Sequence, residues 1–133
     1  MSELSVDIIT AEKSLVEGLT ASSLTAPGIE GEFEILPGHT TFLTALKPGP
    51  LLLLGTGGPQ SFVVSGGFAE VMQGHVRILA DQAELISALK LDQIQTALQE
   101  ATERLAAVDP YSPEAETLRA QQRYLEMQQD LIG

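Results

Sequence analysis

The sequence contains no cysteine, and histidine occurs only twice among its 133 residues. Without cysteine, the chain can form neither a disulfide framework nor a thiolate metal site. Basic residues are scarce as well: seven lysines and arginines stand against 18 acidic residues, which gives a net charge of −11. Nucleic-acid binding depends on basic patches that displace counterions, and the same negative charge opposes direct docking on anionic lipid. We therefore exclude nucleic acid as a partner.

Long apolar runs are also missing. The longest covers residues 51–54, whereas a membrane-spanning helix needs about 20 apolar residues. Residues 1–5 are acidic and lack the apolar segment of a secretory signal. We therefore expect a soluble chain without direct membrane insertion, and any association with a membrane should go through a protein partner.

Most of the chain shows the pattern of short β-strands. Apolar and polar residues alternate over residues 4–8, which is typical of a half-buried strand. Gln73-Gly74 stands between two β-rich runs and predicts a hairpin turn, whereas Gly18 is expected to break one strand from the next. Turn signals recur every 8–12 residues up to position 85, which predicts an all-β sandwich or flattened barrel of about ten strands.

The run of four leucines at residues 51–54 carries a further expectation. Successive side chains of a strand point to opposite faces, so all four leucines cannot face one core. One pair should enter the core, and the other pair should be covered by a partner or by the helical part of the chain.

After residue 86 the spacing changes to that of amphipathic helices. Apolar residues from Leu91 to Val108 recur every three or four positions, and Pro110 ends the pattern. Ser112 is expected to cap a second helix that has Pro113 at its first position. The short connection predicts a C-terminal antiparallel two-helix hairpin. We expect two domains, residues 1–86 and residues 87–133.

The second helix has a thinner apolar stripe than the first. Leu118, Leu125 and Ile132 form this stripe, and Gln122 and Gln129 interrupt it. We therefore expect weak docking of the second helix, which should release more easily than the first.

The most distinctive stretch covers residues 30–49, where turn dipeptides flank two short apolar segments. His39 lies in the corner between them, either bonded to the backbone or as a contact residue on an exposed loop. Glu30, Glu32 and Glu34 alternate along an expected strand, so they should share one face. That face is either solvated or complementary to a basic loop of a partner. Two histidines without a carboxylate constellation make a poor metal or catalytic site.

Three segments resemble one known family. They are Glu-Gly-Glu-Phe-Glu-Ile-Leu-Pro-Gly-His at 30–39, Ser-Gly-Gly-Phe-Ala-Glu-Val at 65–71 and Arg-Ile-Leu-Ala-Asp at 77–81. Together they resemble the epsilon subunit of the F-type ATP synthase, which is called delta in mitochondria. The resemblance covers nearly the whole chain, including its helical tail.

The resemblance implies a non-catalytic subunit of the rotating central stalk. Its β domain would bind the gamma subunit and touch the c-ring, with Glu32 and His39 at the positions that match the ring contact. It would help to couple proton flow to ATP synthesis. It would be a peripheral membrane protein through the complex, on the cytoplasmic face of a bacterial membrane or the stromal face of a thylakoid.

The resemblance also implies that the hairpin restrains ATP hydrolysis by reaching the alpha/beta head with basic side chains. Residues 87–133 carry four basic and eight acidic groups, a net charge of −4, so approach to an acidic partner is opposed. We expect weak inhibition that rests on Arg119 and Arg123. Leu91 and Asp92 match the start of an ATP-binding segment of some bacterial members. Gln95 and Thr96 replace its Arg and Ala, so only a weak ATP candidate and no other cofactor is expected.

Two other hypotheses stay open at this point. A free-standing β-sandwich binding module would dimerise through the helical stripe of Leu118, Leu125 and Ile132, whereas a stalk subunit should co-purify with gamma. An enzyme would need a pocket with converging carboxylates and a histidine.

Overall fold

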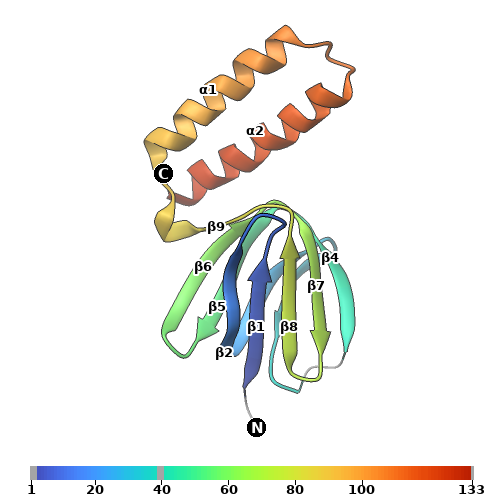
Figure 1. The fold of residues 1–133 in the computed structure, drawn as a ribbon, viewed down its shortest axis with the longest axis vertical. Helices are drawn as coiled ribbons and strands as arrows, with labels where there is room; N and C mark the ends of the chain where they lie inside the picture. The colour runs from blue at the N-terminus through green and yellow to red at the C-terminus, as the bar shows by residue number, and fades with distance from the viewer. Residues whose placement is uncertain (1–2, 39–40, 133) are drawn as a thin grey trace. The chain divides into compact units, whose positions relative to one another are not determined.

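A computed structural model of the chain describes residues 3–38 and 41–132. The chain divides into two compact units, Met1–Leu85 and Ile86–Gly133. The first is built of strands and the second of helices (Figure 1). The predicted fold class, an all-β sandwich followed by a two-helix hairpin, is confirmed.

Nine strands lie in the described part of the β unit, in agreement with the expected number of about ten. They are β1 (Leu4–Ile9), β2 (Ser14–Gly28), β3 (Gly31–Ile35), β4 (Phe42–Leu46), β5 (Gly49–Gly55), β6 (Gly58–Val64), β7 (Gly67–Met72), β8 (His75–Ala80) and β9 (Ala83–Leu85). All pair antiparallel except β1 with β8, which is parallel.

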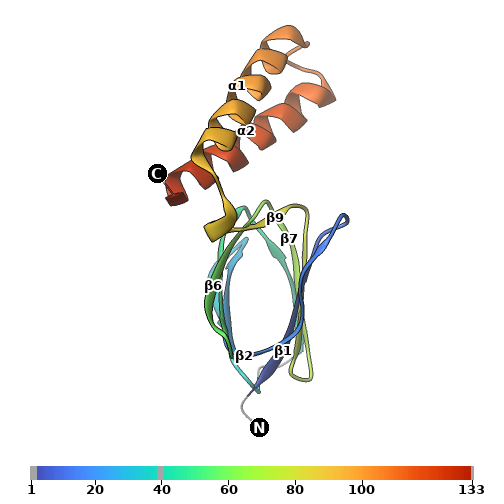
Figure 2. The same ribbon diagram turned by 60° about the vertical axis from the view of Figure 1, so that its left-hand side comes forward.

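The long strand β2 belongs to both layers of the sandwich. Its first half pairs with β1, and its second half lies between β3 and β5. One layer therefore runs β2–β1–β8–β7–β4, and the other runs β3–β2–β5–β6–β9. Figure 2 shows the two layers facing each other. Leu4, Val6 and Ile8 of β1 point into the core between them, as their alternation predicts.

Gly18 does not break the strand, and that expectation was wrong. Val6 is paired with Leu19 but Ile8 with Val16, so two residues of β2 lie opposite Asp7. This is a β-bulge, and Gly18 supplies the φ of +60° that the bulge needs. A glycine inside a strand pattern indicates either a break or a bulge, and here β2 continues for 15 residues.

The turn at residues 73–74 and the leucine run at residues 51–54 agree with what the sequence predicts. Gln73 and Gly74 have φ values of 50° and 81°, and they connect β7 and β8 as a two-residue hairpin turn. In β5, Leu51 and Leu53 are buried, while Leu52 and Leu54 are partly exposed in the chain by itself. The expectation that a partner or the hairpin covers the outer pair stays a prediction.

The helical unit contains η1 (Ile86–Ala88), α1 (Leu91–Ala107) and α2 (Pro113–Ile132). Ser112 caps α2 as predicted: its Oγ accepts a hydrogen bond from the amide of Ala115 at 3.1 Å. Among the described residues, no helix has the length and apolar character needed to cross a bilayer.

The two helices pack through fewer large side chains than a continuous stripe would give. Ile94 and Ala101 are the buried residues of α1. Those of α2 are Ala115, Leu118, Tyr124, Leu125 and Gln128. Two glutamines of α2 take part in this packing, and the expected weak docking of α2 stays a prediction. Gln128 is buried, and Nε2 of Gln122 donates a hydrogen bond to Oγ1 of Thr102 across the hairpin at 3.1 Å.

A chain truncated after Ser87 should fold by itself. It retains β9, which pairs with β6, and it keeps the whole core of the β unit. We expect a cooperative thermal melt and a circular dichroism spectrum of β type, because the described core residues of this unit all lie between Leu4 and Leu85. A non-cooperative melt of the truncated chain would contradict the division into two folding units.

Candidate functional site

The outer face of the layer β4–β7–β8–β1 carries an apolar row. Strand register places Ala45 opposite Phe68, Phe68 opposite Leu79, and Leu79 opposite Ile9. Phe68 is 52% exposed and Leu79 is 45% exposed. Leu43 of β4, one row away, is 66% exposed. Exposed apolar side chains gathered on one face mark an interaction surface. We call Leu43, Ala45, Phe68 and Leu79 the apolar face.

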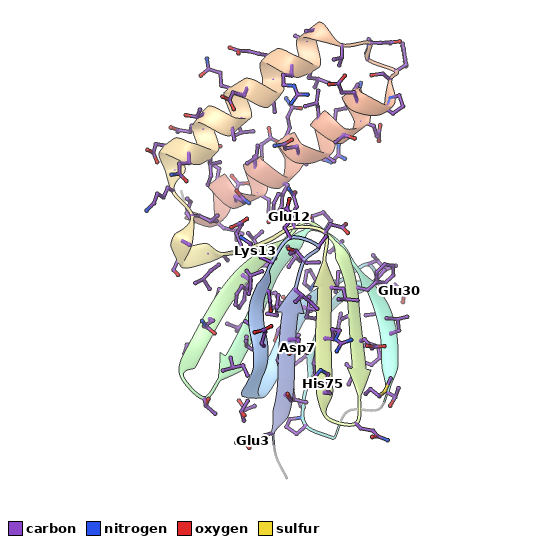
Figure 3. All side chains as sticks on the ribbon, in the orientation of Figure 1. Glu3, Asp7, Glu12, Lys13, Glu30 and His75 are labelled. Atoms are coloured by element: carbon purple, nitrogen blue, oxygen red, sulfur yellow. The ribbon has the colours of Figure 1, made fainter. Side chains whose placement is uncertain are left out.

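A charged row runs beside the apolar row on the same layer. Glu70 lies opposite Arg77, which lies opposite Asp7. Oδ2 of Asp7 lies 3.0 Å from Nε2 of His75, which donates to it, and 3.8 Å from Nε of Arg77. Figure 3 shows Asp7 and His75 side by side on β1 and β8. The other carboxylate oxygen, Oδ1, accepts a hydrogen bond from the Gly18 amide at 2.7 Å. One carboxylate therefore links β1 to the bulge of β2 and to β8.

These contacts explain the titration of Asp7. The Gly18 amide, which donates to the ionised carboxylate, is the main reason that the pKa of Asp7 lies below its usual value. Partial burial acts in the opposite direction, and His75 and Arg77 add to the lowering of the pKa. Because the folded pKa is depressed, Asp7 stabilises the fold above the unfolded pKa of about 3.9, and this contribution is lost as the pH falls through the folded pKa.

Replacing Asp7 should therefore change the pH dependence of stability. We expect Asp7→Ala to lower the free energy of unfolding by about 1–2 kcal/mol at neutral pH, because the bulge amide and His75 lose their charged acceptor. Asp7→Asn keeps an acceptor oxygen and should cost less. Urea unfolding between pH 7 and pH 2.5 measures this: the gap between wild type and Asp7→Ala should shrink below about pH 4. A gap of constant size would contradict the role given to the charge.

An acidic cleft is lined by residues of β3 and β4 and of the turn that joins β2 to β3. Its volume is about 490 Å³. The rings of Phe33 and Phe42 meet edge to face, with centroids 5.7 Å apart. Glu32 projects beside them and is exposed. The residues around the cleft are Gly28, Glu30, Gly31, Glu32, Phe33, Phe42, Leu43 and Thr44. An open cleft with carboxylates at its rim and aromatic rings beside them suits a basic side chain of a partner.

The structure differs from the sequence expectation for the glutamates. Glu32 and Glu34 share the exposed face of β3, but Glu30 lies in the turn before that strand. Glu30 and Glu32 nevertheless both border the cleft. His39, the other residue expected to contact the c-ring, lies outside the described residues, so this expectation stays a prediction.

The two basic residues singled out on α2 have different surroundings. Nη2 of Arg119 donates a hydrogen bond to the carbonyl oxygen of Pro110, and Nη1 lies 3.6 Å from Glu116. The side chain of Arg123 is exposed and has no hydrogen bond or ion pair with any residue that the structure describes. The closed hairpin therefore holds one of the two cations and leaves the other accessible.

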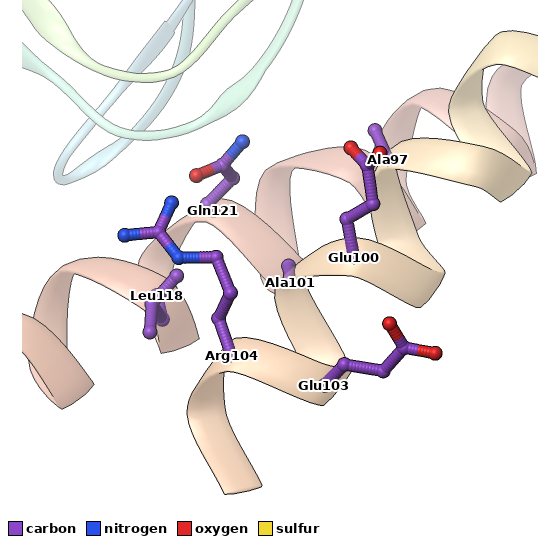
Figure 4. Close-up of a pocket in the computed structure, with 7 residues that line it drawn as sticks. All are labelled: Ala97, Glu100, Ala101, Glu103, Arg104, Leu118 and Gln121. Atoms are coloured by element: carbon purple, nitrogen blue, oxygen red, sulfur yellow. The ribbon is translucent and has the colours of Figure 1, made fainter. Parts of the chain in front are cut away.

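A shallow groove of about 330 Å³ lies between α1 and α2 (Figure 4). Ala101 and Leu118 are buried beneath it, and Glu100, Glu103, Arg104 and Gln121 surround it. Nη2 of Arg104 lies 3.0 Å from Oε2 of Glu114, which joins the two helices. Both charge signs border the groove, so it favours no ion of one sign.

The weak ATP candidate lies at the start of α1. Leu91 is exposed there, and Oδ1 of Asp92 accepts a hydrogen bond from the Gln93 amide at 3.0 Å. The Thr96 hydroxyl donates to the carbonyl oxygen of Asp92 at 3.0 Å. These contacts are ordinary for the first turn of a helix. The described residues also contain no group of three His, Cys, Asp or Glu side chains that could hold a metal ion.

Sequence reasoning did not single out the apolar face. The signal was present in β7, where Phe68 and Met72 flank Glu70 on one side of the strand and Ala69 and Val71 lie on the other, so apolar residues occur on both sides. The same argument was applied to the leucines of β5, where the outer pair is less exposed.

Comparison with known proteins finds similarity to subunits of ATP synthases. A family model described as ATP synthase, Delta/Epsilon chain, beta-sandwich domain matches residues 3–86. The chain is 38% identical to the ATP synthase epsilon chain of Myxococcus xanthus over 105 residues, which cover 79% of this chain and 76% of the relative. It is 38% identical to that of Nitratidesulfovibrio vulgaris over 122 residues, covering 92% and 90%.

Solved structures show the same fold. A chain in the cryo-EM structure of the Euglena gracilis mitochondrial ATP synthase, OSCP/F1/c-ring, is similar with a TM-score of 0.79 at 22% identity. The match covers all of this chain and 83% of that chain. A chain of the Tetrahymena thermophila mitochondrial ATP synthase central stalk/c-ring is similar with a TM-score of 0.59 at 15% identity, covering 98% and 96%.

Proposed function

The chain belongs to the ATP synthase delta/epsilon chain family, and from this premise we propose that it is a non-catalytic rotor subunit of the proton-translocating F-type ATP synthase. Its β unit links the gamma subunit to the c-ring and so helps to couple proton flow to ATP synthesis. Its hairpin modulates ATP hydrolysis. It is a peripheral membrane protein through this complex, on the cytoplasmic face of a bacterial membrane or the stromal face of a thylakoid.

The observation that carries this proposal is the apolar face. Phe68 and Leu79 lie directly opposite each other in neighbouring strands, and each is about half exposed. In a monomer these side chains would expose apolar surface to water. Burying that surface would stabilise a complex by about 25 cal/mol per Å². A subunit that is permanently held in a stalk would bury them against its neighbour. We assign this face to the gamma subunit.

The acidic cleft supplies the second contact. Glu30 and Glu32 place two carboxylates at its rim, and the net charge of −11 adds a long-range attraction for basic groups. We assign the cleft to the polar loops of the c-ring, with Glu32 as a contact residue and His39, seven positions later in the sequence, as the second.

The proposal gives the chain no active site of its own. His75 is engaged with Asp7 between neighbouring strands, in a contact that joins β1 to β8, and ATP is not required for any of the roles proposed. The hairpin is assigned to the alpha/beta head, where Arg119 and Arg123 are the basic groups of α2 that can meet acidic residues.

Coupled ATP synthesis tests the proposal. Membranes depleted of this subunit should regain proton-driven ATP synthesis when the full chain is added. Glu32→Lys should restore much less, because it places a positive charge against a basic partner. The substitution is exposed, so stability should change by less than about 0.5 kcal/mol. Glu17→Lys, at an exposed position of β2 that does not line the cleft, is the matched control. Equal restoration by wild type and Glu32→Lys would remove Glu32 from the ring contact, and no restoration by wild type would refute the rotor role.

A further inference from the structure

The connection between α1 and α2 is held by an unusual number of polar contacts. Oδ1 of Asp109 accepts a hydrogen bond from the Tyr111 amide at 2.9 Å. The Ser112 hydroxyl donates to the Asp109 carbonyl oxygen at 2.7 Å and accepts from the Ala115 amide. The apex of the hairpin is therefore an ordered turn that presents Tyr111, which is 94% exposed, rather than a loose linker.

Two further contacts reach from this turn to the helices. Arg119, about two turns into α2, donates to the carbonyl oxygen of Pro110, a residue that lies beyond the end of α1. Arg104 in the last turn of α1 pairs with Glu114 in the first turn of α2 at 3.0 Å. Both contacts exist only while the chain reverses direction at residues 108–112. Straightening this connection would break them together.

The apolar packing between α1 and α2 is limited, so these polar contacts contribute to the stability of the closed hairpin. Of the buried residues of α1, Ile94 is large but Ala101 is small, and Ala115 faces inward from α2 near the apex. Leu118 is buried as well, and Leu105 and Val108 are half-buried. The apolar contact near the apex thus consists of few large side chains, and the polar contacts add to it.

We propose that four residues form an apex latch that keeps the hairpin closed: Arg104, Pro110, Glu114 and Arg119. Opening the latch releases the side chains of Arg104 and Arg119 together. Its regulatory meaning rests on the proposed function, but the latch itself does not. In the closed hairpin Arg119 is occupied by Pro110 and Glu116, so it is not available to an acidic partner. Arg123 is available in either state. The two arginines of α2 thus have different roles: Arg119 sets the closed state, and Arg123 does not.

The latch can be tested on the isolated full-length chain by the distance between two spin labels. The chain has no cysteine, so Gln95→Cys and Glu126→Cys, both at exposed positions of α1 and α2, label it uniquely. In the closed hairpin the labels give one short distance. Opening moves them apart by tens of ångströms, because each helix is about 25–30 Å long. We expect Arg119→Ala to raise the open fraction roughly two- to tenfold.

Matched variants make the result specific. Arg123→Ala removes the same charge from the same helix without breaking a contact, so it should leave the open fraction unchanged. Glu114→Gln removes the charge of the acceptor in the Arg104 pair while keeping every arginine, so it should raise the open fraction, though by less than Arg119→Ala. If Arg119→Ala and Glu114→Gln both give the wild-type distribution, the latch is overturned.

Inhibition of ATP hydrolysis then separates the latch from the proposed function. With the assembled head, Glu114→Gln should inhibit more strongly than wild type, because the hairpin opens and all basic groups are retained. A hairpin that opens in Glu114→Gln without any change in hydrolysis would leave the latch standing and refute its regulatory role.

Discussion

Gly67→Ala is expected to lower the free energy of unfolding of the β unit by about 4 kcal/mol or more, which is at the upper end for single substitutions. Gly67 opens β7 with a φ of +135°, where side chains are strained. A Cβ at this position would lie 2.1 Å from the carbonyl oxygen of Leu79 and 2.8 Å from Cα of Ala80. Both atoms belong to the backbone of the paired strand β8, so neither can move without breaking the sheet.

Gly74→Ala is the matched control for this prediction. Gly74 also has a positive φ, +81°, but an added Cβ would meet nothing within 4 Å. Only the backbone strain remains, and the expected loss is about 1–2 kcal/mol. Urea unfolding of the two variants measures the difference. Equal losses would show that the strands β7 and β8 separate easily at this point, against the close approach that the structure describes.

Phe68→Ala should weaken the binding of the chain to the gamma subunit by about tenfold to thirtyfold, the range expected for an aromatic residue at the centre of an interface. The ring lies in the apolar face between Ala45 and Leu79. Because it is half exposed in the chain by itself, its removal should cost little folding stability. Calorimetric titration of gamma with the two forms of the chain measures the ratio.

Tyr111→Ala provides the comparison for Phe68→Ala. It removes an aromatic ring that is almost fully exposed, but from the apex of the hairpin rather than from the β unit. Its affinity for gamma should equal that of wild type. If the two substitutions weaken binding equally, gamma does not recognise the apolar face.

The β unit could be predicted well wherever one face of a strand is buried. In β1 the alternation of Leu4, Val6 and Ile8 settled both the strand and its inward face, because a shift of one residue would turn all three into solvent. Gly18 could not be assigned in the same way. Its φ of +60° fits a break or a bulge equally well, and the choice depends on the Asp7 carboxylate, which is distant in sequence and accepts the Gly18 amide.

The candidate sites were less predictable for a related reason. Phe68 was visible as an apolar residue, but its place in a row with Ala45 and Leu79 depends on the pairing of β4, β7 and β8. Likewise, Arg119 and Arg123 look equivalent in the sequence. Only the reversal of the chain brings Pro110 to Arg119 and leaves Arg123 without such a contact. Periodicity assigns faces within one element, whereas these differences arise between elements.

Affinity purification of the tagged full-length chain from detergent-solubilised source membranes, with the partners identified by mass, tests the central claim most directly. We expect the gamma subunit, the ring subunit and the head subunits in a fixed ratio, and we expect Phe68→Ala to lose gamma while Tyr111→Ala retains it. Recovery of the chain alone, or only as a dimer of itself, would contradict the rotor assignment and favour a free-standing module that associates through its hairpin.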